Sequence, residues 1–244
     1  MKIVAIGDPH GKLPKDLDNI IKRNNPDLII CVGDWAFTPE KPWLEESWKG
    51  IKRKFIDDSY KNSVDKVCSY GLPVLTLRGN MFMTYSKPKA DKFLRKHKNI
   101  INKWTGKHKI KNQDFIFFDL TYEPSTIKKH QLNERFFKNR MKKNSRRERK
   151  LNNLLKENPD SILISHNPPY GYVDKAYNGK HVGSKILLKA IKKHQPRYVF
   201  CGHIHEAKGK AKIGKTQVYN LGSHGDYIVL DTEKNKVLES NFLE

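Results

Sequence analysis

The sequence predicts an α/β fold, and three observations support this prediction. Short runs rich in β-branched residues alternate with stretches whose apolar residues recur at helical spacing. Five of these short runs end in a Gly, Asp, Asn or His. The chain has 244 residues, of which 37% are hydrophobic, which is enough for a core. We expect one domain over residues 1–244.

The first half of the chain predicts strands and helices in alternation. The run KIVAI is followed by apolar residues at helical spacing and then by LIICV, which gives a strand–helix–strand unit with a parallel crossover. Pro73 introduces another strand, VLTLR, and a later pair of strands forms a hairpin that turns near Asn112. The predicted elements are a strand at 2–6, a helix at about 13–21, a strand at 28–32, a helix at 45–70, a strand at 74–78, a helix at 87–98 and a hairpin at 107–123.

The second half predicts a long basic helix and a return to alternating elements. Residues 128–156 carry an intermittent stripe of Leu and Phe, and we expect them to form a basic helical insertion. The closing residues alternate short strands with Gly and Asn turns, which suggests an antiparallel finish. The predicted elements after this insertion are a strand at 161–165, a helix at 183–194, a strand at 198–201 and turns at 213–217 and 232–236.

The chain is strongly basic, with 48 Lys and Arg against 26 Asp and Glu, and its formal net charge is +22. Such a charge favours a polyanionic partner or an anionic substrate. Between Lys128 and Lys150 there are eleven Lys or Arg and two Glu. This segment suits contact with a phosphate backbone, which makes nucleic acid a candidate partner, and it equally suits a solvated helix. Both interpretations stay open at this stage.

The three cysteines predict a reducing compartment. Cys31, Cys68 and Cys201 form no CxxC pair, and two of them lie inside apolar runs, where a thiol acts as a small buried side chain. The first residues show no signal-peptide pattern, and no apolar run approaches 18 residues. We therefore expect a cytoplasmic protein that does not span a membrane. We find no pattern that indicates an oligomeric state.

Polar side chains follow five of the predicted strands, in the motifs GDPH, GD, GN, SH and GHIH. In an open α/β sheet, ligands bind beyond the carboxyl ends of the strands. Placed side by side, these ends would gather oxygen and imidazole donors, which is a metal-ligand set. The candidate ligands are Asp8, His10, Asp34, Asn80, His166, His203 and His205.

The number of candidate ligands predicts two metal ions. Seven ligands exceed what one four- to six-coordinate ion needs, whereas two ions that share one carboxylate would use all of them. Two carboxylates in one cleft repel each other, and cations remove that cost. Asp, Asn and His ligands suit manganese, iron, zinc and nickel alike, and manganese is our first expectation.

The five motifs GDPHG, VGDW, RGN, SHNPP and CGHIHE resemble, in order and approximate spacing, the signature blocks of the calcineurin-like metallophosphoesterase superfamily. The resemblance extends from residue 1 to about residue 231 and is weakest over 81–160. It implies an αββα four-layer sandwich with two mixed β-sheets flanked by helices, two divalent metals and hydrolysis of phosphoesters. By motif position, one metal would be held by Asp8, His10, Asp34 and His205, and the other by Asp34, Asn80, His166 and His203, with Asp34 as the bridge.

The stretch SHNPPYGYVD, with the downstream GSKILLKAIKKH and CGHIHE, is similar to the small phosphodiesterase-like branch of this superfamily. The segment YNLGS resembles its closing NxGS turn near the metals. The family pattern continues GN with a His that contacts the phosphate and protonates the leaving oxygen, but here that position is Met81. Loss of a general acid costs a factor of roughly 10² to 10⁴. His224 and His181 are candidate substitutes, and an ordinary loop histidine is the alternative for each.

The predicted function is a binuclear metal-dependent phosphoesterase, most simply a phosphodiesterase of nucleotide-type or aryl esters. A metal-bridging hydroxide would attack phosphorus in line, with Asp34 and Asn80 among the catalytic residues and His224 as a further candidate. One alternative is a nuclease whose basic face holds DNA or RNA. Another is a metal-binding interaction module with weakened turnover, which the change at Met81 favours. Four aromatic residues follow the second motif and would form a wall for a nucleobase or another flat group, or would cap the core: Trp35, Phe37, Trp43 and Trp48.

Overall fold

The computed structural model describes residues 1–39, 45–80, 87–119 and 134–243. Contacts divide these residues into two compact units, each built on one β-sheet. The first unit contains Met1–Asn102 with Leu221–Glu244, and the second contains Lys103–Asn220. The expectation of a single domain stays a prediction, and the two units are described in turn.

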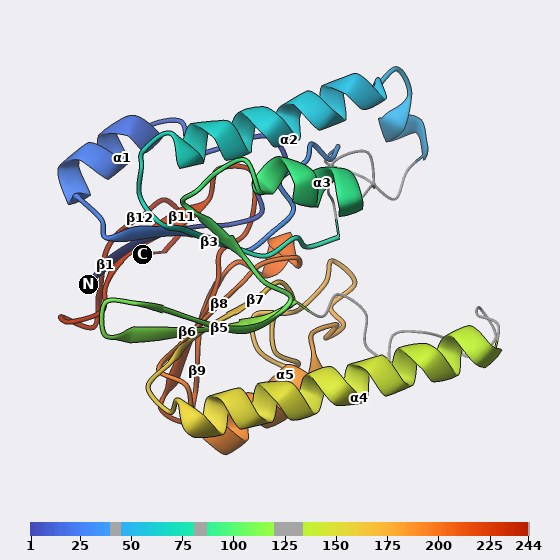
Figure 1. The fold of residues 1–244 in the computed structure, drawn as a ribbon, viewed down its shortest axis with the longest axis vertical. Coiled ribbons are helices and arrows are strands. Elements are labelled where there is room, and N and C mark those ends of the chain that lie inside the picture. The colour runs from blue at the N-terminus through green and yellow to red at the C-terminus, as the bar shows by residue number, and fades with distance from the viewer. Residues whose placement is uncertain (40–44, 81–86, 120–133, 244) are drawn as a thin grey trace. The chain divides into compact units, whose positions relative to one another are not determined.

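The first unit has a mixed six-stranded sheet in the order β12-β11-β1-β2-β3-β4 (Figure 1). Strands β1 to β4 are parallel, whereas β11 is antiparallel to β1 and β12 is antiparallel to β11. The central strands are buried on both faces, which is why they occur as unbroken apolar runs in the sequence. The strand bounds are β1 Lys2–Ile6, β2 Leu28–Cys31, β3 Val74–Thr76, β4 Ile100–Asn102, β11 Tyr227–Asp231 and β12 Lys236–Ser240.

Three helices, α1 (Leu17–Asn24), α2 (Arg53–Cys68) and α3 (Lys87–Leu94), lie along one side of this sheet (Figure 1). Their apolar faces and the sheet form one core cluster, in which Ile20 and Val64 pack with sheet residues such as Val4. A turn of 3-10 helix, η1 (Glu45–Trp48), precedes α2. The amphipathic spacing seen in the sequence is therefore used to cover one face of the sheet.

The second unit also has a mixed six-stranded sheet, in the order β5-β6-β7-β8-β10-β9 (Figure 1). The four central strands are parallel, and an antiparallel strand lies at each edge. The strand bounds are β5 Thr105–Ile110, β6 Gln113–Phe118, β7 Ile162–Ser165, β8 Tyr198–Cys201, β9 Gly209–Ile213 and β10 Thr216–Asn220.

Helices α4 (Glu134–Glu157) and α5 (Lys185–His194) pack on this second sheet. Leu151 and Leu155 of α4 are buried in the core cluster, together with Leu187 and Ile191 of α5. The Ser184 side chain caps α5 by accepting a hydrogen bond of 2.9 Å from the Leu187 N–H, which satisfies one donor of the first turn.

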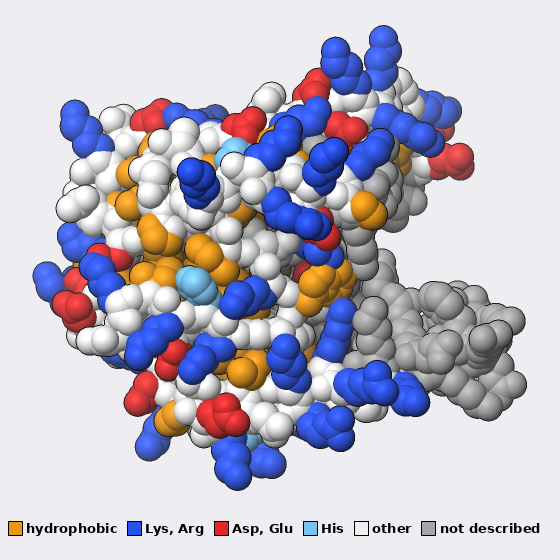
Figure 2. Space-filling model, viewed as in Figure 1, with side chains coloured by type: hydrophobic (Ala, Val, Ile, Leu, Met, Phe, Trp, Pro, Cys, Tyr) orange, Lys and Arg blue, Asp and Glu red, His pale blue; other side chains and the backbone are white. Residues whose placement is uncertain are grey.

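The described part of the basic segment 128–156 belongs to helix α4, which has one face exposed to solvent. Arg146, Arg149 and Lys150 of α4 are exposed, whereas Leu151 is fully buried. Residues 128–133, the start of the predicted insertion, lie outside the described residues. Figure 2 shows Lys and Arg side chains spread over the visible face with Asp and Glu among them. None of the described helices is long and apolar enough to cross a membrane.

The predicted α/β class, with two mixed sheets flanked by helices, is confirmed. The hairpin near Asn112 is confirmed as β5 and β6. The prediction of one helix over 45–70 is wrong, because a break separates η1 from α2 and Gly50 within it has a φ of +78°. The predicted helix over 87–98 ends at Leu94, and the short strand β4 was not predicted.

The antiparallel finish is confirmed. Strands β9 and β10 form one antiparallel pair and strands β11 and β12 form another, each connected at a predicted turn. Strand β10 also pairs in parallel with β8, which was not predicted. Such a long-range pairing leaves no local signature in the sequence.

All three cysteines are free and buried, whereas burial was predicted only for the two that lie inside apolar runs. Burial raises the pKa of the Cys31 thiol and raises the pKa of Cys68 to about 12. Both thiols are therefore neutral at physiological pH and act as small apolar side chains.

Candidate metal centre

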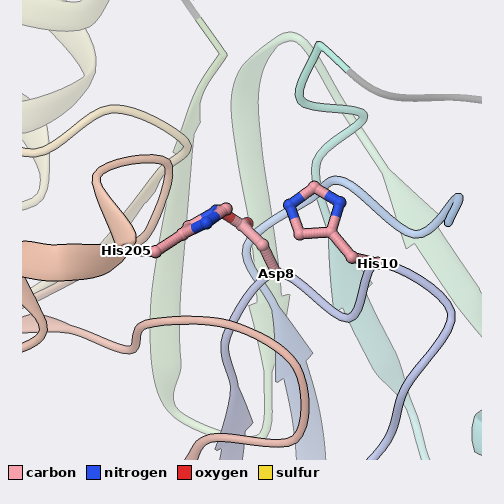
Figure 3. A group of neighbouring side chains, drawn as sticks. All are labelled: Asp8, His10 and His205. Carbon is pink, nitrogen blue, oxygen red and sulfur yellow. The ribbon is translucent and has the colours of Figure 1, made fainter. Parts of the chain in front are cut away.

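The loop after β1 holds two of the predicted ligands, Asp8 and His10, in a buried turn (Figure 3). The Asp8 N–H donates to the Gly222 carbonyl at 3.0 Å, and the Asp8 carbonyl accepts the His224 N–H at 3.0 Å. His10 has a φ of +46°, a conformation that an L residue adopts only where surrounding contacts hold it. The turn is therefore fixed by the backbone of the segment that follows residue 220.

Gly7 permits this close approach. A Cβ atom at Gly7 would lie 2.4 Å from the Leu221 carbonyl oxygen and 2.5 Å from that of Gly222. Both contacts are with backbone atoms, which cannot rotate away. The Gly of the GDPH motif is thus a packing requirement, and it places Asp8 directly after the strand.

Asp34 lies directly after the Gly that follows β2 and is held by three backbone contacts. Its N–H donates to the Arg78 carbonyl at 3.1 Å, and its own carbonyl accepts the His10 N–H at 2.9 Å. The Asn80 N–H donates to Asp34 Oδ1 at 2.6 Å. His10 Nε2 lies 3.9 Å from Asp34 Oδ2. The loops after β1, β2 and β3 therefore bring four predicted ligands together: Asp8, His10, Asp34 and Asn80.

The chemistry of this group fits a cation. Asp8 and Asp34 are 0% and 2% exposed, so two carboxylates from neighbouring loops are buried beside His10. Burying an ionised carboxylate costs several kcal/mol unless positive charge or hydrogen bonds compensate. A divalent ion would remove the repulsion between the two groups and offset the cost of burying their charges. The imidazole of His10 would supply a second type of ligand suited to transition metals.

The second unit gathers three imidazoles. His166 follows β7 and is fully buried, and its carbonyl accepts the Gly202 N–H at 3.0 Å. The rings of His166 and His203 have centroids 4.8 Å apart. His203 has a φ of +69°, and His205 begins the 3-10 turn η5 (His205–Ala207; Figure 3). The loops after β7 and β8 thus hold three of the predicted ligands.

His224 lies beside a predicted ligand. Its ring centroid is 5.2 Å from that of His10, and its Nδ1 is 2.8 Å from the Ser223 Oγ. The NxGS turn therefore places this histidine next to the loop after β1. Met81, which follows Asn80, lies outside the described residues.

The described tryptophans after Asp34 support the interpretation as a cap on the core, and the Phe37 ring packs edge-on against the Phe55 ring with centroids 5.0 Å apart. Trp35 is 1% exposed, lies in the core cluster and donates from Nε1 to Thr76 Oγ1 at 3.0 Å. Trp48 packs against the same cluster, and Trp43 lies outside the described residues. Trp35 is therefore part of the core and does not line a binding surface.

The sequence reasoning did not single out Asp174, which is fully buried and hydrogen-bonded to His181. A lone aspartate in the segment YGYVDKAY carries no motif. The only local signal is its place between two glycine-containing turns, and that signal is common in loops.

Comparison with known proteins identifies the family. The family model for calcineurin-like phosphoesterases matches residues 1–207. An uncharacterized protein of Methanocaldococcus jannaschii is 29% identical over 249 residues, which cover 99% of this chain and 97% of that protein. A 70-residue stretch is 40% identical to human metallophosphoesterase domain-containing protein 1 and covers 28% of this chain and 21% of that protein.

Solved structures show the same fold. A dimetal phosphatase from Danio rerio aligns with a TM-score of 0.61 at 11% identity and covers 94% of this chain and 91% of its own. An archaeal phosphodiesterase aligns with a TM-score of 0.50 at 15% identity and covers 97% of each chain. Because the family model spans most of the chain and includes all seven predicted ligands, the chain belongs to the calcineurin-like phosphoesterase family.

Proposed function

We propose that this protein is a binuclear metal-dependent phosphoesterase that hydrolyses phosphodiesters. One observation carries the proposal. Two carboxylates, Asp8 and Asp34, are buried next to His10, and the backbone around them is held by hydrogen bonds that leave their position little freedom. A buried acidic pair of this kind is stable with bound cations and costly without them.

In this proposal two groups of predicted ligands each hold one ion. Asp8, His10 and His205 would bind one ion, and Asp34, His166 and His203 would bind the other. Asn80 would add an amide oxygen, and Asp34 would bridge the two ions. Manganese is the first ion to test, since the donor set suits several transition metals. Two bound divalent ions supply a water-derived nucleophile at neutral pH and stabilise charge on the phosphoryl oxygens.

The protein's own residues have a positioning role. The Asn80 N–H fixes one Asp34 oxygen, Oδ1, which leaves Oδ2 on the side of His10. The half-buried His224 lies beside His10, where its ring can contact a phosphoryl oxygen. We assign it to substrate binding. Because Met81 cannot donate a proton, another group must protonate a poor leaving oxygen.

A phosphoester assay tests the proposal. The purified chain with added manganese should hydrolyse bis(4-nitrophenyl) phosphate, and chelation should abolish this turnover. Asp34→Asn should reduce kcat by at least about 10²-fold, because one bridging carboxylate charge is lost. Asp18→Asn, an exposed aspartate on α1, is the matched control and should leave kcat unchanged. Turnover that needs no metal, or that survives Asp34→Asn, would contradict the proposal.

The nuclease alternative rests on the exposed Arg146, Arg149 and Lys150 of α4. Binding of a labelled oligonucleotide across a salt series separates it from small-substrate hydrolysis. A steep fall of affinity with rising salt, together with metal-dependent cleavage, would favour the nuclease. Metal binding without turnover of any phosphoester would favour the interaction module.

A further inference from the structure

The loop that follows the SHNPP motif contains a buried carboxylate. Asp174 is 0% exposed, and its Oδ2 accepts the N–H groups of Gly171 at 2.9 Å and Gly183 at 2.8 Å. Isolated β-bridges between Pro169 and Ser184 and between Lys175 and His181 close the loop around it. This arrangement leaves Oδ1 to make a further contact.

The further contact is with His181. Asp174 Oδ1 and His181 Nδ1 are 2.5 Å apart, and the His181 side chain is 34% exposed. A buried carboxylate that accepts from Nδ1 fixes the ring orientation and leaves Nε2 to face a reactant. Histidine is the side chain that most often serves as a general acid or base, and a fixed ring orientation suits that role.

Gly183 shows how closely the loop is built around this pair. A Cβ atom at Gly183 would lie 2.7 Å from the Pro168 carbonyl oxygen and 2.8 Å from Asp174 Oδ2. The chain therefore requires a glycine here to keep the carboxylate in place.

The loop is tied to the segment that carries two predicted metal ligands. The Asn220 side-chain amide donates to both the Val173 and the Ile204 carbonyls at 2.9 Å. The Tyr177 N–H donates to Glu206 Oε1 at 2.8 Å. Ile204 and Glu206 are the neighbours of His205. The loop that contains Asp174 and His181 is thus connected twice to the segment around η5, once through the Asn220 side chain and once directly.

We propose that His181 is the general acid of this enzyme, and the proposal rests on the function proposed above. As the bond between phosphorus and the leaving oxygen breaks, His181 Nε2 gives its proton to that oxygen. The nucleophilic water supplies the new oxygen on phosphorus, and His181 is reprotonated from solvent. Asp174 is a positioning residue that holds Nδ1–H throughout. His181 then supplies the proton that the residue at position 81 cannot.

The test compares two substrates that differ only in the leaving group. Methyl 4-nitrophenyl phosphate has a stable leaving anion, whereas methyl phenyl phosphate needs a proton. With manganese present, His181→Asn should lower kcat for the phenyl ester by roughly 10² to 10³ and change the nitrophenyl ester by less than about threefold. Asp174→Asn should show the same selectivity with a smaller loss. His194→Asn, an outlying histidine held by Asn152, should change neither rate.

Each outcome decides the proposal. Equal losses on both esters would mean that His181 only braces the loop, and no loss on either would remove it from the reaction. His181→Gln, with its melting temperature, repeats the test should His181→Asn fail to fold. If the wild-type chain hydrolyses neither ester with metal, the proposed function falls and this inference falls with it. Turnover with unchanged leaving-group selectivity overturns the inference alone.

A second readout does not depend on activity. In the zinc-loaded protein, ring nitrogen NMR should show that the neutral His181 ring keeps its proton at Nδ1, and Asp174→Asn should abolish this preference. Addition of inorganic phosphate should shift the Nε2 resonance of His181. An Nε2 resonance that is unaffected by phosphate would overturn the assignment.

Discussion

Replacement of Gly79 by Ala tests whether the support of Asp34 is needed for metal binding. A Cβ atom at Gly79 would lie 2.1 Å from Asp34 Oδ1 and 2.7 Å from the Asp34 backbone nitrogen. Real Cβ atoms keep at least 3.0 Å from such neighbours. The Asp34 carboxylate would have to move by roughly 1 Å, several times the tolerance of about 0.2 Å in metal–ligand distances.

Gly71 provides a matched control. Both glycines have a φ of +71°, but a Cβ atom at Gly71 would meet nothing within 4 Å. Alanine in the left-handed region costs about 1–2 kcal/mol at either position. The difference between the two variants therefore isolates the contact with Asp34, including the 2.6 Å hydrogen bond from the Asn80 N–H that the displaced carboxylate would lose.

The assay measures manganese affinity by calorimetry and melting temperature without metal. Gly71→Ala should lower the melting temperature by about 2–8 °C, as expected for 1–2 kcal/mol in a chain of this size, and should leave the affinity unchanged. Gly79→Ala should weaken manganese binding by about 10- to 100-fold, the range seen when the support of a metal ligand is removed. Equal manganese affinity in the two variants would refute the reasoning, since Asp34 would then bind metal from a displaced position.

Two further predictions concern stability. Hydrogen bonding to Arg23 lowers the pKa of Glu239 to about 2, so its stabilising effect is complete above pH 4.5 and is lost as the pH falls through 2. Chemical denaturation of Glu239→Gln should show a loss of about 1 kcal/mol at pH 7, after allowance for solvent screening. The difference from wild type should shrink as the pH falls through 2 and vanish below it, and a constant difference would contradict the linkage. Ser184→Ala should lower the free energy of unfolding by about 1 kcal/mol and the melting temperature by about 2–4 °C, because it removes the cap of α5. The control Ser69→Ala, at an exposed helix end, should lower both only slightly. Equal effects of the two variants would argue against the cap.

Much of the architecture was predictable because the signals are local. The unbroken apolar runs at 2–6 and 28–32 predict buried strands, and the helical spacing of Leu17 and Ile20 predicts the face that packs on the sheet. The break at Gly50 was missed, because the apolar residues on both sides keep a helical spacing. Strand β4 was missed because three residues are too few to show a period.

The candidate ligand residues could be named from the sequence for a different reason. Each follows a buried strand, and the order of the motifs is itself a family signature, so Asp8 and Asp34 could be named before their surroundings were known. The sequence did not reveal how they are held. The contacts from Gly222 to Asp8 and from Asn80 to Asp34 join residues 214 and 46 positions apart, and such pairings depend on the fold.

The sequence alone determined the class of the fold, the family and the chemical type of the candidate ligands, since these depend on periodicity and on motifs within a few residues. It also singled out His181. Only the tertiary structure decided that His181 has a buried carboxylate partner, because the Asp174 side chain is oriented by backbone donors from both ends of its loop. Hydrogen bonds that close a loop depend on where the chain returns in space, which no local pattern encodes.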